Sequence, residues 1–441
     1  MLKSTFVFLV IIGGLLLCND TVYGRSIKKR KIKKQFKHSQ IVNDHFTGFA
    51  LYDLDNKKMI YELNADKYFT PASNTKLFTF YTCLKMLGDS VPALRYETRH
   101  DSLVFWGTGD PSFLHSDLKG VNAYSFLQHS NKTLYYSATG YANDFFGSGW
   151  AWDDYGDYYQ AEINGLPLED NVALIYADQD GNLQVKPNYL KRFLTCDTSY
   201  HPKKFNVKRD FLSNNFTYPA MAIPAKFKQE IPWKTSTDLT RALLQDTLKR
   251  PVWEANLPLN SNAKIIYNAS ADSVYRRMLQ PSDNFIAEQL LLACSSIKFN
   301  TLNTDSVISY SKTHFLNDLP DAPQWVDGSG LSRRNLFTPR SIIALLCKIE
   351  DEVKDDQLLH SMMPAGGTTG TIKTAYKTDN GQVFVWAKTG SLGNVYNQSG
   401  YLVTRKGKRL AFSFMNNGFT RPVKEIRDEM VRIMTYIHEE F

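Results

Sequence analysis

Two regions of similar character stand at the two ends of this chain, and a long region of different character separates them. The first contains a predicted β-hairpin over 46–62 and an apolar helical run that opens at Pro71 and Ser73. Residues 93–261 instead carry short β-like runs with many glycine, asparagine, aspartate and aromatic residues. Helical and strand-like patterns then return, over 272–295, 339–351, 382–388, 399–404, 409–415 and 422–439. We therefore predict an α/β (α+β) lobe formed by 41–92 and 262–441, with a β-rich domain inserted at 93–261.

The N-terminus has the pattern of an exported protein. Lys3 precedes an apolar run over 6–17, which predicts a secretory signal over 1–24, with an uncleaved anchor as the alternative. The chain has 52 basic and 44 acidic residues, and nine of the basic residues but only one acid fall in 1–40. We expect 25–40 to be a basic, disordered leader, in which 25–37 either is solvated or contacts an anionic membrane surface. Export to the periplasm or cell envelope argues against a nucleic acid as the partner of these charges.

The cysteines and histidines do not form a metal-binding pattern. After the signal, Cys83, Cys196, Cys294 and Cys347 remain, and no two of them form a C-x-x-C pair. Three lie in apolar helical runs, where buried free thiols are expected, although a disulfide stays open in an oxidising compartment. The H-E-x-x-H motif of metallopeptidases is absent. We expect neither a metal nor another cofactor.

The segment Pro71-Ala-Ser73-Asn-Thr-Lys76 places a serine and a lysine three residues apart at a predicted helix start. Residues at i and i+3 share a helix face, so the Lys76 amine can reach the Ser73 hydroxyl. A lysine that is held neutral by burial can take the proton of a serine and make it a nucleophile. Taken alone, the same pattern is typical of an exposed helix start with a capping serine.

Two further segments contain hydroxyl, amide and amine groups. Ser282-Asp-Asn284 follows a proline where another helical run begins, and taken alone it also resembles a helix cap. Lys388-Thr-Gly390-Ser391 ends a predicted strand, whose edge can pair with an extended peptide and bring positive charge to its carboxylate. Strict alternation along the strand puts Lys388 and Thr389 on opposite faces.

The three segments together are the signature S-x-x-K, S-D-N and K-T-G of penicillin-binding proteins and class A β-lactamases. Longer segments resemble the D-alanyl-D-alanine carboxypeptidase/endopeptidase family of low-molecular-mass penicillin-binding proteins. These segments are Gly107 to Pro111, Gly149 to Asp154, Ser282 to Glu288, Asp327 to Arg333 with Thr338-Pro339, and Gly366 to Thr371. The resemblance covers about 45–435 and implies a transpeptidase/β-lactamase-like lobe with a domain inserted between the first and second motifs.

The resemblance also implies a mechanism. Ser73 is expected to be acylated, with Lys76 as its base and Ser282 relaying a proton to the leaving group. Asn284 is expected to orient the substrate and Lys76, and Lys388 to help keep Lys76 neutral by charge repulsion.

The remaining expected roles concern binding. Lys388, Thr389 and Gly390 are expected to hold the substrate, and the backbone N–H groups of Ser73 and Ser391 to form an oxyanion hole. The substrates implied are peptidoglycan stem peptides, and β-lactams are the implied covalent inhibitors.

Two other segments lie beside these motifs. The aromatic residues Trp150, Trp152, Tyr155, Tyr158 and Tyr159 are expected to pack in the core of the insert, with stacking on substrate as the alternative. Asp327-Gly-Ser-Gly-Leu is expected to shape a turn near the site, with Ser329 in a structural role.

Two other functions remain open. A penicillin sensor or wall-binding protein would be acylated without turnover. A β-lactamase would need an efficient base for deacylation. Glu169 precedes Asn171, but both stand before Ser282 and do not match the usual E-x-x-L-N order.

Overall fold

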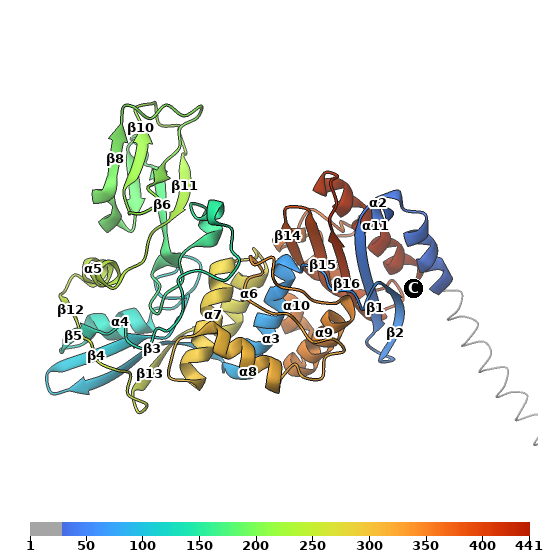
Figure 1. The fold of residues 1–441 in the computed structure, drawn as a ribbon, viewed down its shortest axis with the longest axis horizontal. Helices are drawn as coiled ribbons and strands as arrows, with labels where there is room; N and C mark the ends of the chain where they lie inside the picture. Colours follow the sequence, from blue (N-terminus) through green and yellow to red (C-terminus); the bar gives the residue numbers. More distant parts are fainter. Residues whose placement is uncertain (1–28) are drawn as a thin grey trace, which may run out of the picture.

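The computed structural model describes residues 29–441, so the predicted signal over 1–24 lies outside the described residues. Helices and sheets are mixed, as predicted, and they form two parts (Figure 1). We call residues 29–89 and 271–441 the main lobe, and residues 90–270 the insert. Within the described residues, the helices are all too short or too polar to cross a bilayer.

The main lobe is built on an antiparallel five-stranded sheet in the order β14-β15-β16-β1-β2. The N-terminal strands β1 (Phe46–Asp53) and β2 (Lys58–Leu63) form the predicted hairpin. They pair with the C-terminal strands β14 (Val385–Leu392), β15 (Val395–Val403) and β16 (Arg409–Asn417) through β1 and β16. The two ends of the chain thus complete one sheet, and β14 is left at its edge.

Helices cover both faces of this sheet. On one face Ala411 and Met415 pack with the helices α3 (Lys76–Met86), α6 (Ala271–Leu279), α7 (Asn284–Lys298), α8 (Thr304–His314), α9 (Pro339–Val353) and α10 (Asp356–Met362). On the other face Phe412 and Phe414 pack against α11 (Val423–Glu440), beside the short α2 (Gln40–Asn43). Alternate side chains of β16 point to opposite faces of the sheet, so this one strand contributes residues to both cores.

The prediction of a disordered leader over 25–40 is wrong for its described part. Residues 29–37 are helical, and Ile32 and Phe36 are fully buried in the core beneath α11. Their spacing of four places them on one face of the helix, and the lysines and Arg30 occupy the exposed face. Burial of two large apolar side chains therefore orders a segment that its charge alone suggested would be solvated.

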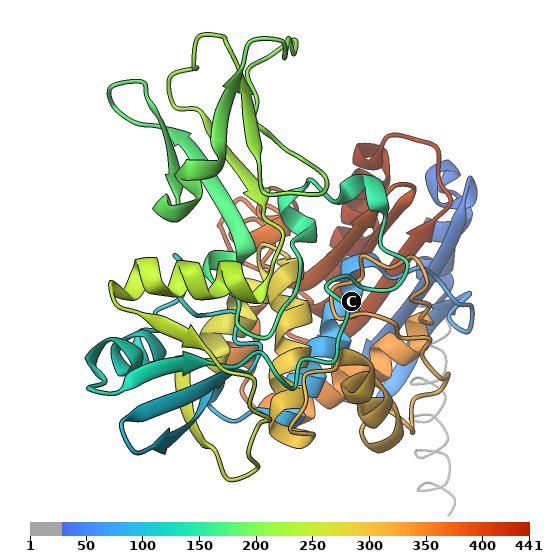
Figure 2. The same cartoon turned by 60° about the vertical axis from the view of Figure 1, so that its left-hand side comes forward.

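The insert contains three sheets. A five-stranded sheet has the order β12-β5-β4-β3-β13, with strands Val252–Glu254, Thr133–Tyr136, Ser102–Gly107, Ser90–Arg99 and Lys264–Ser270. Beside it lie α4 (Asn122–His129) and α5 (Thr237–Leu248). Two three-stranded sheets of the insert project away from the main lobe in both views (Figures 1 and 2). One is β11 (Lys228–Pro232), β6 (Val172–Ala177) and β7 (Leu183–Lys186), and the other is β8 (Leu194–Asp197), β10 (Phe216–Pro219) and β9 (Lys208–Arg209).

One loop of the insert returns to the main lobe. Residues 137–165 contain only the short 3₁₀ turns η2 (Trp152–Asp154) and η3 (Tyr158–Gln160). Trp150 donates to Asp327 (2.9 Å), and the Tyr159 carbonyl accepts from Asn284 (3.0 Å). This loop therefore forms one wall beside the second motif, and the insert takes part in shaping the site.

Candidate active site

Ser73 lies in a tight turn that a strand of the sheet holds in place. The turn is the 3₁₀ helix η1 (Ala72–Thr75), and α3 begins only at Lys76. Asn397 on β15 donates to the carbonyls of Thr70 and Pro71, both at 2.9 Å. Ala72 has φ +48°, an uncommon backbone conformation for a residue with a side chain. The predicted α-helical start is thus a 3₁₀ turn, in which residues i and i+3 are aligned and Lys76 follows Ser73 on the same side.

Lys76 is fully buried, and its amine contacts three oxygen atoms. Its Nζ lies 2.9 Å from Ser73 Oγ, 2.6 Å from Asn284 Oδ1 and 2.7 Å from the Ser329 carbonyl. Burial lowers the pKa of Lys76 from its ordinary 10.5 to about 8, against the charges of nearby carboxylates, Glu288 foremost. A neutral amine here can donate to Asn284 and Ser329 and still point its lone pair at the Ser73 hydroxyl. This is the arrangement that a general base requires.

The second motif stands at the start of α7. Asp283, and not Ser282, caps this helix by accepting from the Ile286 N–H (3.0 Å). Ser282 has φ +70°, so its backbone departs from the usual conformations at the point where the motif begins. Its hydroxyl accepts from Lys388 Nζ at 2.7 Å. The structure therefore joins the second and third motifs directly, as it joins the first and second through Lys76 and Asn284.

The third motif lies on the edge strand β14. Lys388 is fully buried, and burial together with the Lys76 charge lowers its pKa well below the ordinary value. Thr389 Oγ1 donates to Thr371 Oγ1 at 2.7 Å, so the alternation of the strand gives the two side chains different partners. A Cβ atom at Gly390 would lie only 2.3 Å from the Pro71 carbonyl, so glycine is required where β14 approaches η1. Ser391, the next residue, is exposed.

Burial and charge both act on the two buried lysines of the site. Burial is the main cause of the lowered Lys76 pKa, and the named charges that act on Lys76 are carboxylates, which raise it. The pKa of Lys388 is lowered by burial and by the nearby Lys76 charge. Because repulsion between two positive charges is mutual, the expectation that Lys388 helps to keep Lys76 neutral stays a prediction.

Sequence reasoning missed Glu288 as part of the site. Its carboxylate accepts from the N–H groups of Gly328 (2.9 Å) and Ser329 (2.7 Å). Burial raises the pKa of Glu288 to about 8, and the nearby Asp327 charge acts in the same direction. The Asp327 loop is thus the expected turn, and the Ser329 carbonyl faces Lys76. Glu288 stands four residues after Asn284, one helical turn along α7, and this spacing was the available signal.

The prediction that the aromatic run packs in the core of the insert is wrong for the run as a whole, because only Tyr155 is buried, against Phe146 and Phe211 of the insert. The core cluster of the insert contains none of the five residues. Trp152 and Tyr158 are 77% and 58% exposed. Tyr155 is buried, and its hydroxyl donates to Glu162 (2.6 Å). The run instead belongs to the loop that returns to the main lobe, so two rings are free to meet a ligand.

Several known proteins that resemble this chain are named carboxypeptidases or penicillin-binding proteins. D-alanyl-D-alanine carboxypeptidase DacB of Haemophilus influenzae is 24% identical over 426 residues, which cover 85% of each chain. Penicillin-sensitive carboxypeptidase A of Dictyostelium discoideum is 23% identical over 399 residues, 78% of this chain and 76% of that protein. The crystal structure of penicillin-binding protein 4 (dacB) from H. influenzae matches with a TM-score of 0.69 at 20% identity, over 92% of this chain and 99% of that one.

The fold match covers both the main lobe and the insert, because it extends over nearly all of both chains. The model of the D-Ala-D-Ala carboxypeptidase 3 (S13) family matches residues 29–437, a range that contains all three motifs and begins with the N-terminal helix. This chain therefore belongs to the D-Ala-D-Ala carboxypeptidase 3 (S13) family.

Proposed function

We propose that the protein is a serine-type D-Ala-D-Ala carboxypeptidase, DD-endopeptidase, or both, that acts on peptidoglycan stem peptides through an acyl-enzyme on Ser73. The observation that carries this proposal is the contact between Lys76 Nζ and Ser73 Oγ at 2.9 Å, with the other two contacts of the amine made to acceptors. A buried lysine with this set of partners is not needed for stability, because an apolar side chain in its place would stabilise the fold better.

Acylation begins with the neutral amine of Lys76. It takes the Ser73 proton while Ser73 Oγ attacks the carbonyl carbon of the penultimate D-Ala. The backbone N–H groups of Ser73 and Ser391 are proposed to stabilise the oxyanion. Gly390 supports this role because it allows the β14 backbone to approach η1 closely.

The leaving group departs on the side of the second and third motifs. Ser282 Oγ, 2.7 Å from Lys388 Nζ, is placed to pass a proton to the leaving amine. Lys388 and Thr389 are proposed to bind the carboxylate next to that amine, and a bound carboxylate favours the charged form of Lys388. Asn284, which contacts Lys76, is proposed to hold the substrate amide. Water then attacks the ester and releases Ser73.

β-Lactams fit the same chemistry as covalent inhibitors. They present a strained amide and a carboxylate in place of the terminal D-Ala-D-Ala, so attack by Ser73 opens the ring and leaves an ester. Labelling by a penicillin therefore reports the acylation step alone, independently of the leaving peptide.

We place the enzyme in the periplasm or cell envelope, where its substrate lies. The exposed face of helix 29–37 carries Lys29, Arg30, Lys31, Lys33, Lys34 and Lys37, and we propose that it contacts anionic lipid. Co-sedimentation with vesicles that contain anionic lipid, lost at high salt and absent with neutral vesicles, is the expected result. Equal binding to both vesicles would contradict an electrostatic contact.

The test of the function uses purified protein, a pentapeptide muropeptide and a cross-linked muropeptide dimer, with products separated by chromatography. We expect release of D-Ala, cleavage of the dimer, or both, and covalent labelling by a fluorescent penicillin. Ser73→Ala should abolish cleavage and labelling together. Ser309→Ala, the same change on the exposed surface of α8, should leave both unchanged.

The outcomes separate the alternatives. Cleavage that persists in Ser73→Ala overturns the mechanism. Labelling of the wild type without any peptide cleavage identifies a penicillin sensor, and rapid release of opened penicillin with no peptide cleavage identifies a β-lactamase.

A further inference from the structure

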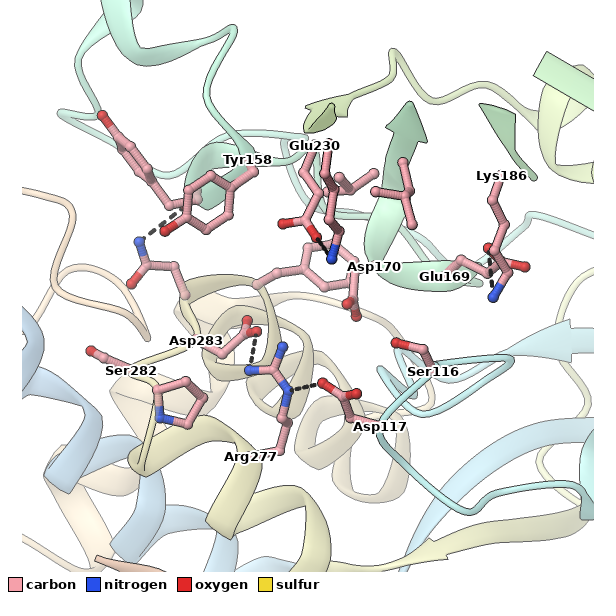
Figure 3. Close-up of a pocket in the computed structure, with 17 residues that line it drawn as sticks. Ser116, Asp117, Tyr158, Glu169, Asp170, Lys186, Glu230, Arg277, Ser282 and Asp283 are labelled. Carbon is pink, nitrogen blue, oxygen red and sulfur yellow. Dashed lines mark hydrogen bonds and ion pairs between the residues drawn. The ribbon is translucent and has the colours of Figure 1, made fainter. Parts of the chain in front are cut away.

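A cavity of about 330 Å³ opens beside Ser282, between the main lobe and the insert. Figure 3 shows its base on the main lobe, formed by Ser282, Asp283 and Arg277, and its opposite wall on the insert. The insert contributes the turn η4 (Glu169–Asn171), β7 and β11 to this wall. Cavities of this size between two parts of a chain are typical of ligand sites. Ser73 and Lys76 do not line it, so it adjoins the catalytic centre only through the second motif.

Ion pairs cover the walls of this cavity. Arg277 contacts Asp283 (3.0 Å) and Asp117 (3.1 Å) at the base. On the insert, Lys228 lies 3.4 Å from Glu230, and Lys186 lies 3.7 Å from Glu169. Lys228 and Glu230 are both exposed, so their ion pair can break at low cost. Lys228 can then pair with a carboxylate of a ligand, and Glu230 with an amine. The lining suits a polar peptide that carries charges of both signs.

Asp170 marks where such a ligand would donate a hydrogen bond. Its Oδ2 lies 3.0 Å from His115 Nε2, but its buried Oδ1 finds no hydrogen-bond donor among residues 29–441. An unpaired buried carboxylate oxygen costs free energy, and a ligand N–H or ammonium would remove that cost. Figure 3 shows this carboxylate directed from the insert into the cavity, toward Arg277 and Asp117.

The cavity is much larger than the leaving group of a carboxypeptidase, which is a single D-Ala. It has room for roughly ten water molecules at about 30 Å³ each. A single D-Ala displaces far fewer. In the proposed reaction the amine leaves beside Ser282, and Ser282 and Asn284 are the residues through which the cavity meets the catalytic centre. Whatever is attached to the leaving amine therefore enters this cavity.

From these observations we infer that the cavity is the leaving-group subsite for cross-link cleavage and holds the second stem peptide of a cross-linked dimer. This inference rests on the proposed function. The bond between the D-Ala carbonyl and the cross-linking nitrogen breaks as the bond to Ser73 Oγ forms. The nitrogen takes a proton through Ser282 and leaves as the free amine of the second stem. Water then hydrolyses the ester, so each turnover consumes one water and yields two separate stems.

The test compares leaving groups of different size on the same enzyme. Asp170→Asn keeps the left-handed backbone of this position, which asparagine tolerates, and keeps a partner for His115. A second variant, Lys228→Ala with Glu230→Ala, removes an exposed ion pair of the wall. For each we expect kcat/KM for the cross-linked dimer to fall about fivefold or more, mainly through KM. Release of D-Ala from the pentapeptide monomer and acylation by penicillin should stay within about twofold of the wild type.

The control is Lys424→Ala with Asp428→Ala, a comparable exposed ion pair on α11, which should change none of the three activities. An equal loss on dimer and monomer would assign the cavity to the acyl stem, and no loss on the dimer would leave it without a role in cleavage. Either result overturns the inference and leaves the proposed function standing. A wild type that releases D-Ala but does not cleave the dimer also overturns the inference and leaves the proposed function standing. A wild type that cleaves neither substrate overturns the proposed function itself.

Discussion

The two five-stranded sheets of the molecule differ in the polar side chains that they bury. In the main lobe, β15 buries Asn397, Gln398 and Ser399 completely. In the insert, the corresponding interior positions of the sheet hold Leu94, Phe105 and other apolar residues. The first sheet therefore buries a run of consecutive polar residues, whereas the buried polar residues of the second, Arg95 and Asn268, stand singly among apolar ones.

The difference is explained by what the polar groups contact. Asn397 donates to the two carbonyls that precede Ser73, and Ser399 Oγ accepts from Asn74 at 2.8 Å. Each buried group is paired, so its desolvation is offset. The sheet of the main lobe is a template for the turn that presents Ser73, whereas the core of the insert is mainly apolar. Changes in the main lobe should then alter chemistry, and changes in the core of the insert should alter stability.

The largest effect is expected from Lys76→Ala. Removal of the base should lower the rate of penicillin acylation about a thousandfold, because general base catalysis contributes roughly 10²–10⁴. Stopped-flow or gel-based labelling measures it. Lys85→Ala, nine residues along the same helix and exposed, should have no effect. A similar loss in both variants would mean that the helix, and not the amine, is what acylation needs.

The next effect is a dependence on pH. In the proposed mechanism the neutral amine of Lys76 is the base. Its pKa is about 8, so well below that value the neutral fraction falls tenfold for each pH unit. Acylation should therefore slow about fiftyfold between pH 8 and pH 6, and rise by no more than about twofold above pH 8. A rate that does not change over this range would show that Lys76 is not the base, or that burial does not lower its pKa.

A smaller effect is expected from Glu288→Gln. Glutamine can accept from only one of the two N–H groups that Glu288 holds, so the Ser329 carbonyl should shift away from Lys76 and acylation should fall about tenfold. Ionised Glu288 raises the Lys76 pKa, and the Glu288 pKa is itself about 8. Loss of the part of that charge present near pH 8 should move the midpoint of the pH profile to lower pH. Glu352→Gln, on an exposed ion pair with Lys85, is the control. An unmoved midpoint would limit Glu288 to a structural role.

The parts of the site that could be predicted from the sequence were those with short spacings. Ser73 with Lys76, and Ser282 with Asn284, each stand close together in the sequence, and they were recognised because they occur with the Lys388 segment as one signature. The Asn397 contacts to residues before Ser73 span more than 300 positions, and no local pattern reports such a pair. The positive φ of Ala72 and Ser282 is likewise uncommon for alanine and serine, so their residue types do not predict it.

The fold class was predicted from the separation of two similar regions, but two segments were misread. The leader was judged by its charge, although Ile32 and Phe36 stand one helical turn apart and would have indicated a packed helix. The aromatic run was judged by its apolar rings, which in most chains belong to a core. Here the loop that carries it crosses to the other lobe, and local sequence does not show where a loop goes.

The smallest effect on chemistry is expected in the core of the insert. Leu190 is fully buried there, in the 3₁₀ helix η5 (Asn188–Phe193). Leu190→Ala should lower the free energy of unfolding by about 2–5 kcal/mol, because it leaves a cavity among packed side chains. Acylation by penicillin should change less than about twofold, because Lys76, Ser73 and Lys388 are positioned by the main lobe. Thermal unfolding and labelling of the same preparation measure both quantities. A parallel loss of acylation would show that the core of the insert also supports the loop over 137–165, and the division of roles between the two sheets would then fail.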